Sequence, residues 1–398
     1  MNIKGYVYKN EVYSERETVF DSMILNKDYN SKIQFSFYED VFDAINWQVE
    51  PSTDISILYK LRAQQLRDKY DYLILLFSGG SDSVQILNTF LKNNIFIDEI
   101  QITHHSEMIN RLDRNALLND PALKEFLEYE YAALPMLKKV SELSPSTKIT
   151  TLDASQYISD QFFKKQFTHL SNDKNFVSGH QKLYVVMPRA SLHYINYHNV
   201  FVKEPPNNSC LIRGFEKPIL YFEYGKNRLC FSFNDMVMHN VIKYSRKELP
   251  DWLSTEDFFW SKDAPLIPVK QSHMIKRVLE HNKEFYDGFV AAKVDIFKHS
   301  LKNKAGYSPA INFDRMYNDI IYPDWNNTIF TANKPSTVIP EFKLAETVSG
   351  QHQALDFVNE VVNYYENKYS LIANKKQFKD ILYTKPYIVG DLSLSWLD

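Results

Sequence analysis

The chain has 398 residues, of which 44% are hydrophobic and 15% aromatic, so it is long and apolar enough for packed cores in more than one domain. Lys and Arg total 46 against 49 for Asp and Glu; a formal net charge of −3 gives no overall basic field of the kind that marks nucleic-acid binders, although a local basic patch remains compatible with it. Two cysteines, Cys210 and Cys230, are too few for a zinc quartet or an iron–sulfur ligand set, and no run approaches the roughly 18 apolar residues of a membrane span, so we expect a soluble, cytoplasmic protein with packed, reduced thiols.

Residues 1–70 are mixed in pattern and predict an elaboration in front of the core that follows. Aromatic alternation over 33–37 indicates a strand, and residues 55–69 have the spacing of a helix that lies on a sheet. In that helix we expect Leu61 on the buried side and Arg62 on the polar side.

From residue 71 the chain alternates between apolar runs and helical spacing. Such alternation predicts an α/β fold, in which right-handed crossovers build a parallel sheet with helices on both faces. We assign residues 71–205 to this domain and expect ligands beyond the carboxyl ends of its strands. The expected strands are 72–77, 99–103, 148–152 and 175–177, and the expected helices are 82–92 and those within 121–143.

A turn-rich break at residues 204–208 separates the alternating strand and helix patterns from a region with different sequence patterns. Residues 218–233 read as a hairpin around Tyr224-Gly225-Lys226-Asn227, and residues 272–297 and 355–369 have amphipathic helical spacing. We therefore expect residues 206–398 to form a C-terminal α+β region that holds a substrate or a partner.

The most informative segment is Ser78-Gly79-Gly80-Ser81-Asp82-Ser83, between the first strand and the first helix of the alternation. Two glycines let the backbone approach a ligand closely, and the N–H groups of the first helical turn face a phosphate held there. The plain alternative is a Gly-Gly turn with a Ser or Asp helix cap. The spacing matches neither G-x-x-x-x-G-K-[ST] nor G-x-G-x-x-G.

The hexapeptide resembles the S-G-G-x-D-S signature of the PP-loop, or N-type ATP pyrophosphatase, superfamily, whose adenine nucleotide alpha-hydrolase-like members have a HUP-like sheet. The resemblance implies that ATP binds with Mg2+, that a substrate oxygen attacks the α-phosphorus, and that pyrophosphate leaves from the loop. A nucleophile then displaces AMP from the adenylated substrate. By the same resemblance, residues 78–83 bind the nucleotide and Asp82 holds the metal and serves catalysis.

Two further groups follow expected strands. Thr103 and His104 resemble the neighbourhood that receives the adenosine of ATP in this superfamily, and the alternative is a polar loop that caps a helix. Gly179 and His180 resemble a later G-H turn in which the histidine donates, acts as an acid or contacts phosphate. Gln181 and Lys182 follow where acidic residues are usual, so an ordinary loop histidine remains the other interpretation.

Three cations, Arg189, Arg213 and Lys217, could neutralise ATP phosphates in a transition state, and we select Lys217 as a catalytic candidate. The alternative for each is a solvated surface group. The histidines lack an H-E-x-x-H arrangement, so we expect no zinc hydrolase.

Differences between this sequence and known members of the superfamily reduce the number of enzyme types that it can resemble. Met1 stands where glutamine-hydrolysing members carry a nucleophilic cysteine, and the cysteines cannot form the metal set of 7-cyano-7-deazaguanine synthases. The sequence outside the hexapeptide also resembles PP-loop proteins of tailed bacteriophages, at residues 62–71, 217–218, 267–271 and 321–325. We expect an AMP-forming ligase or nucleotide-modifying enzyme that acts on a small molecule or nucleotide; the alternative is a nucleotide-binding sensor or assembly module without ligase chemistry.

Overall fold

The fold is known from a computed structural model of the whole chain. It describes residues 3–14, 16–155, 206–214, 217–223, 226–238, 253–293, 316–325, 340–350, 367, 371–372 and 383–396. Every structural statement below concerns these residues.

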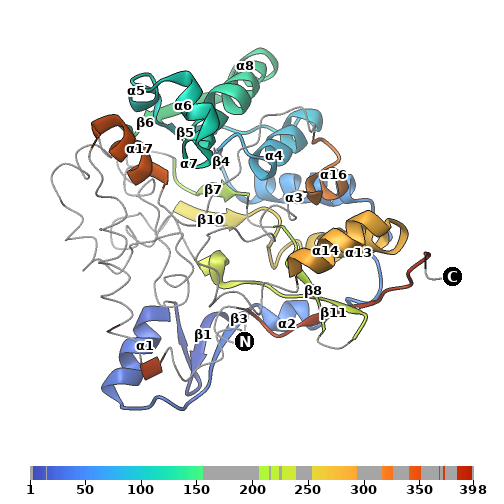
Figure 1. Cartoon of the computed structure of the whole chain (residues 1–398). Coiled ribbons are helices and arrows are strands. Elements are labelled where there is room, and N and C mark those ends of the chain that lie inside the picture. Colours follow the sequence, from blue (N-terminus) through green and yellow to red (C-terminus); the bar gives the residue numbers. More distant parts are fainter. Residues whose placement is uncertain are drawn as a thin grey trace.

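A parallel sheet with the strand order β10-β7-β4-β5-β6 lies in the upper half of the view in Figure 1. In chain order its strands are β4 (Tyr72–Leu76), β5 (Glu99–His104), β6 (Lys148–Asp153), β7 (Ser209–Arg213) and β10 (Leu253–Asp257). The chain leaves β4 towards β5 and β6 on one side and returns to β7 and β10 on the other. The direction of the connections therefore switches between β4 and β7, which is where open α/β sheets bind ligands.

The sheet confirms the predicted α/β class and corrects its extent. The runs expected at 72–77, 99–103 and 148–152 become β4, β5 and β6. The apolar residues of β4 and β5 are mostly buried, whereas β6 is an edge strand whose residues are exposed or partly exposed. Strands β7 and β10 lie beyond residue 205 and pair in parallel with each other, and β7 pairs in parallel with β4. The domain boundary predicted at residue 205 therefore falls inside the sheet. The strand expected at 175–177 lies outside the described residues.

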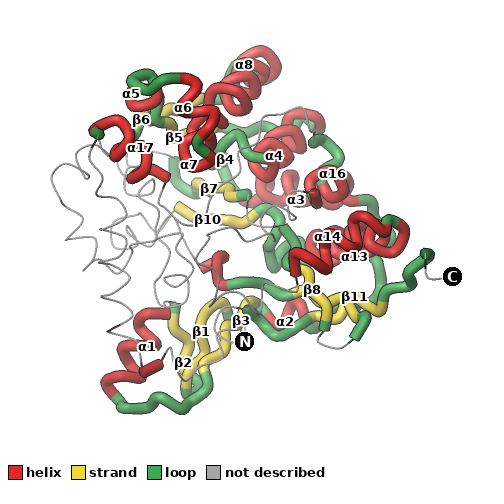
Figure 2. Tube along the Cα trace, viewed as in Figure 1, coloured by secondary structure: helices red, strands yellow, loops and turns green. Residues whose placement is uncertain are grey.

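Helices of the central region cover this sheet (Figure 2). The helix α3 (Ile55–Lys69), as predicted, and α4 (Ser81–Lys92) both contact β4 and each other, and α8 (Leu134–Leu143) contacts α4, so the three lie in one layer. The connection from β6 to β7 lies mostly outside the described residues. Shorter elements join β5 to α8: α5 (Ser106–Ile109), α6 (Arg114–Asn119), α7 (Pro121–Lys124), the 3-10 turn η1 (Glu125–Leu127) and the π-helix η2 (Tyr129–Ala133).

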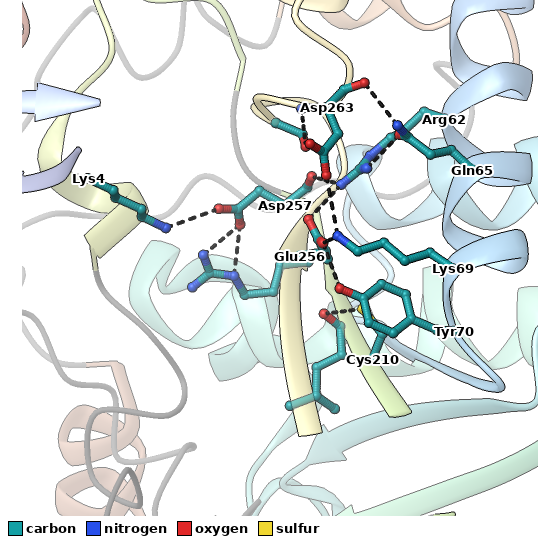
Figure 3. A network of polar contacts seen from close by, with 12 residues as sticks. Lys4, Arg62, Gln65, Lys69, Tyr70, Cys210, Glu256, Asp257 and Asp263 are labelled. Atoms are coloured by element: carbon teal, nitrogen blue, oxygen red, sulfur yellow. Dashed lines mark hydrogen bonds and ion pairs between the residues drawn. The ribbon is translucent and has the colours of Figure 1, made fainter. Parts of the chain in front are cut away.

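The face that α3 buries differs from the one predicted. Leu61 is 57% exposed, whereas the side chain of Arg62 is fully buried. The reason is Glu256 at the end of β10, whose Oε2 lies 3.0 Å from Arg62 Nη2, with Lys69 Nζ and the Tyr70 hydroxyl each 2.7 Å from Oε1 (Figure 3). Burial alone would raise the pKa of Glu256, but the charge of Arg62 and these hydrogen bonds lower it below its ordinary value. An ionised carboxylate therefore ties α3 to the edge strand.

The N-terminal elaboration is a small antiparallel sheet of order β2-β1-β3. Its elements are β1 (Lys4–Tyr8), β2 (Glu11–Tyr13), α1 (Arg16–Leu25), β3 (Ile33–Phe37) and α2 (Glu39–Phe42). Lys4 lies 3.9 Å from Asp257 at the carboxyl end of β10, and the Tyr6 hydroxyl donates to Asp235 at 2.6 Å. The elaboration thus docks beside the carboxyl edge of the parallel sheet.

A third sheet, of order β11-β9-β8, contains the predicted hairpin. Its rings join those of the N-terminal part in one aromatic core, in which Phe233 lies 4.4 Å from Phe42 and 5.1 Å from Trp260 between ring centroids. The remaining elements are β8 (Leu220–Phe222), β9 (Arg228–Phe231), η3 (Asp235–Met238), α13 (Leu266–His281), α14 (Lys283–Lys293), α16 (Asn318–Ile321), α17 (Pro340–Ser349) and β11 (Tyr387–Asp391).

The helix expected over 272–297 is two helices, because Asn282 has extended backbone angles between α13 and α14. Most of the helix expected over 355–369 lies outside the described residues. Among the helices described, none is long and apolar enough to cross a bilayer.

Candidate functional site

The loop of residues 78–80 joins β4 to α4 at the switch point of the sheet. Gly79 has φ +84°, a conformation that side chains other than glycine rarely adopt. A Cβ there would lie 2.9 Å from Cβ and 3.0 Å from the backbone N of Ala133 in η2. Backbone conformation and close approach together therefore require glycine at this position.

Hydroxyl groups fix the shape of the loop from within. The Gly80 N–H donates to Ser78 Oγ at 3.2 Å, and Ser83 Oγ donates to the Gly80 carbonyl at 3.0 Å. The Ser78 N–H also donates to Ser83 Oγ, at 3.3 Å. Ser78 and Ser83 thus hold the turn against the helix that it begins.

The capped-turn alternative is not what the loop forms. The N-cap of α4 is Gly80, and no side chain caps the helix. The N–H groups of Ser81, Asp82 and Ser83 have no acceptor within the helix, because the first turn of any α-helix leaves its donors unsatisfied. These donors and the helix dipole favour an anion at the loop.

A carboxylate and an ammonium group meet beside the loop. Lys217 Nζ lies 2.7 Å from Oδ1 and 2.9 Å from Oδ2 of Asp82, and the Tyr322 hydroxyl donates to the same Oδ1. Lys217 is 13% exposed and Asp82 28% exposed, so both side chains remain within reach of a ligand. The structure thus brings together two predicted catalytic residues and adds Tyr322, which sequence reasoning did not select as a site residue.

The end of β7 approaches α4 closely from the other side of the switch point. A Cβ on Gly214 would lie 3.1 Å from Asp82 Cβ and 3.3 Å from the Ser83 N, so glycine lets this segment pass the first turn of the helix. Arg213, by contrast, is buried, and its Nε lies 2.8 Å from Asp257 Oδ1. It is therefore committed to an ion pair with β10, and of the two predicted cations that the structure describes, Lys217 is the one beside the loop.

Thr103 and His104 end β5, the neighbour of β4 on the opposite side from β7. The His104 ring stacks on Tyr129 with centroids 4.3 Å apart and planes 15° apart, and Nδ1 accepts the Ser106 N–H at 3.3 Å. Burial lowers the pKa of His104 below its ordinary value, and Asp153, 3.6 Å from Nδ1, opposes that shift. Burial thus favours the neutral form of His104. Thr103 Oγ1 is buried without a hydrogen-bond partner within the described ranges.

The π-helix η2 contacts both the end of β5 and the loop after β4. Its first residue, Tyr129, covers His104, and its last, Ala133, packs on Gly79. Such helices are rare and recur at functional sites. The residues expected to be helical over 121–143 gave no indication of this π turn, because apolar spacing does not distinguish a π from an α turn over five residues.

The other predicted site residues, Gly179, His180 and Arg189, lie outside the described residues. Within the described part, no group of three or more histidine, cysteine or acidic side chains is arranged to hold a metal ion. Asp82 is thus a single carboxylate ligand candidate.

Comparisons of the chain with protein-family models, with curated proteins and with solved structures found no match.

Proposed function

We propose that the chain binds ATP at residues 78–83 and adenylates a substrate with release of pyrophosphate, as a member of the PP-loop superfamily with a HUP-like sheet, encoded by a bacteriophage. The observation that carries the proposal is the uncapped start of α4 behind a glycine turn at the switch point, with Lys217 and Asp82 beside it. Donors, dipole and ammonium group are all suited to a polyphosphate.

The residues at the site fit the steps of such a reaction. A substrate oxygen attacks the α-phosphorus, the bond from that phosphorus to the bridging oxygen breaks, and pyrophosphate leaves with the electron pair. The negative charge that develops there is stabilised by the N–H groups of Ser81, Asp82 and Ser83 and by the Lys217 ammonium group. A nitrogen or sulfur nucleophile then displaces AMP from the adenylated substrate.

The adenosine part is assigned to the neighbouring strand end. The flat pair of His104 and Tyr129 offers an aromatic edge beside the loop, and the Thr103 hydroxyl is a donor without a partner in the described structure. We assign the base and ribose to the end of β5. We also propose, from the resemblance alone, that Gly179 and His180, which lie outside the described residues, contact the nucleotide.

Magnesium fits the site in part. Asp82 is acidic, partly exposed and at a helix start, but Lys217 and Tyr322 already donate to its carboxylate. Bound Mg2+ would neutralise phosphate charge and would use the Asp82 oxygens that Lys217 occupies. Lys217 would then be free to contact the phosphates, which also carry negative charge.

The experiment measures pyrophosphate release from ATP in the presence of Mg2+ and a mixed metabolite pool. We expect Ser78→Ala and Asp82→Ala to abolish ATP binding or pyrophosphate release; unchanged binding and turnover in both variants would refute the proposal. Because the Asp82 carboxylate is already engaged, a binding module without ligase chemistry is the second candidate. Measurable ATP affinity with no exchange of labelled pyrophosphate into ATP, whatever substrate is added, would select that candidate.

A further inference from the structure

Two residues of the segment 316–325, Tyr322 and Asp324, contact one face of α4, which is far from them in sequence. The Asp324 N–H donates to Gln85 Oε1 at 3.1 Å, and Gln85 Nε2 donates back to Asp324 Oδ2 at 3.3 Å. Asn88 Nδ2 donates to the Asp324 carbonyl at 3.4 Å, and Lys92 forms an ion pair with the Asp324 carboxylate. With Asp82 below them, these residues form one stripe of the helix, because steps of three and four residues return to the same face.

Tyr322 stands at the loop end of this stripe and is held firmly. Its side chain is 2% exposed, and its ring centroid lies 5.3 Å from that of Phe259. The preceding carbonyl, of Ile321, accepts the Tyr59 hydroxyl at 2.9 Å, and that hydroxyl accepts Gln271 Nε2 at 2.8 Å. A buried ring with an anchored backbone leaves its hydroxyl in one place, on Asp82 Oδ1.

The two donors on Asp82 differ in what they do to its charge. Lys217 contacts both oxygens and carries a full positive charge, so it is attracted by phosphate as well as by carboxylate. The Tyr322 hydroxyl is neutral and contacts one oxygen. When Lys217 turns towards a phosphate, the hydroxyl keeps the carboxylate oriented and leaves its negative charge available to a cation.

We propose that Tyr322 is a positioning residue of the nucleotide site, and that the segment 316–325 is a brace that sets the orientation of Asp82 for the metal that accompanies ATP. This inference rests on the proposed function, and it gives the part of the chain beyond residue 300 a role in the site. Within the described residues, the brace meets the site at Asp82 through the Tyr322 hydroxyl and at Lys217, whose Nζ lies 5.7 Å from the Tyr322 ring centroid. Tyr322→Phe keeps the ring, so it removes the contact with Asp82 alone.

The test is calorimetric titration of the full chain with ATP over a series of Mg2+ concentrations. Tyr322→Phe removes only the hydroxyl. The matched control is Tyr72→Phe, because the Tyr72 hydroxyl donates to a carboxylate, Glu99 Oε2 at 2.9 Å, at the amino end of the same sheet. Asp324→Ala loosens the brace without removing a group from Asp82.

We expect Tyr322→Phe to need about tenfold more Mg2+ for half-maximal ATP binding, the scale of one hydrogen bond to a charged group, with ATP binding in the absence of Mg2+ unchanged. Asp324→Ala should shift the requirement in the same direction by a smaller factor, and Tyr72→Phe should not shift it. An unchanged Mg2+ requirement in Tyr322→Phe, with or without a lower melting temperature, or a lower requirement, would overturn the inference and leave the proposed function standing. Failure of the wild-type chain to bind ATP would overturn both.

Discussion

Replacing Gly79 by alanine should destabilise the fold much more than the same change at its neighbour Gly80. At Gly79 the new Cβ would meet Ala133 Cβ at 2.9 Å, its N at 3.0 Å and its Cα at 3.2 Å, all inside normal contact distance. The backbone of η2 would have to move, because two of these three atoms belong to it. Gly80 has φ −71°, and its nearest neighbour for a Cβ is the Ser78 hydroxyl oxygen at 3.3 Å.

The size of the effect follows from two separate contributions. A left-handed backbone conformation costs about 1–2 kcal/mol for a residue with a Cβ. Overpacking against a fixed neighbour adds about 1–3 kcal/mol, so Gly79→Ala should reduce the free energy of unfolding by about 2–5 kcal/mol. Gly80→Ala should cost about 1 kcal/mol at most, the difference between glycine and alanine at a helix N-cap.

Gly350 separates the two contributions. It follows α17 with φ +70°, and a Cβ there would meet nothing within 4 Å. Gly350→Ala should therefore cost about 1–2 kcal/mol, the conformational part alone. Urea unfolding followed by circular dichroism measures all three variants. If Gly79→Ala were no more destabilising than Gly350→Ala, the close approach between η2 and the loop would be refuted.

Three further predictions concern groups outside the loop. Arg62→Met should lower the free energy of unfolding by about 2–3 kcal/mol in urea, because it leaves the largely buried Glu256 carboxylate short of a partner, and adding Glu256→Gln should recover part of that loss. Burial lowers the pKa of His104 in the folded state, so the folded chain binds fewer protons than the unfolded one below about pH 6.5. Stability should fall as the pH falls below that value, and His104→Gln should show a shallower fall in pH-dependent melts; an identical slope would contradict the burial argument. Cys210 and Cys230 are buried, and burial raises the pKa of the Cys210 thiol, so a thiol reagent should label neither in the native state and both in denaturant.

The strand, loop and helix that carry the candidate site could be predicted because they are determined by neighbouring residues in the sequence. An apolar run buried on both faces, two glycines and helical spacing after them occupy adjacent positions, and β4, the loop and α4 formed as expected. Lys217 was selected as the catalytic candidate from three cations, although nothing in the sequence says which of them reaches the loop. Of the two that the structure describes, Arg213 pairs with Asp257, and Lys217, which follows the close approach of Gly214 to α4, reaches Asp82.

Tyr322 and its brace could not be predicted, because their effect depends on contacts across 240 positions. The same holds for Arg62, whose helical position suggests solvent until Glu256 from β10, 194 residues away, supplies the opposite charge. The place of β7 and β10 in the sheet was missed for a related reason. Pairing partners are chosen by tertiary packing, and a turn-rich stretch before β7 looked like a boundary.

The assignment of residues 78–83 as a pyrophosphate site is tested by comparing ATP with AMP in calorimetric titrations of the wild-type chain in the presence of Mg2+. We expect ATP to bind and AMP to bind at least tenfold more weakly, because AMP lacks the two phosphates assigned to residues 78–83 and Lys217. Equal affinity for the two nucleotides, or no binding of either, would contradict the assignment of the loop as a pyrophosphate site.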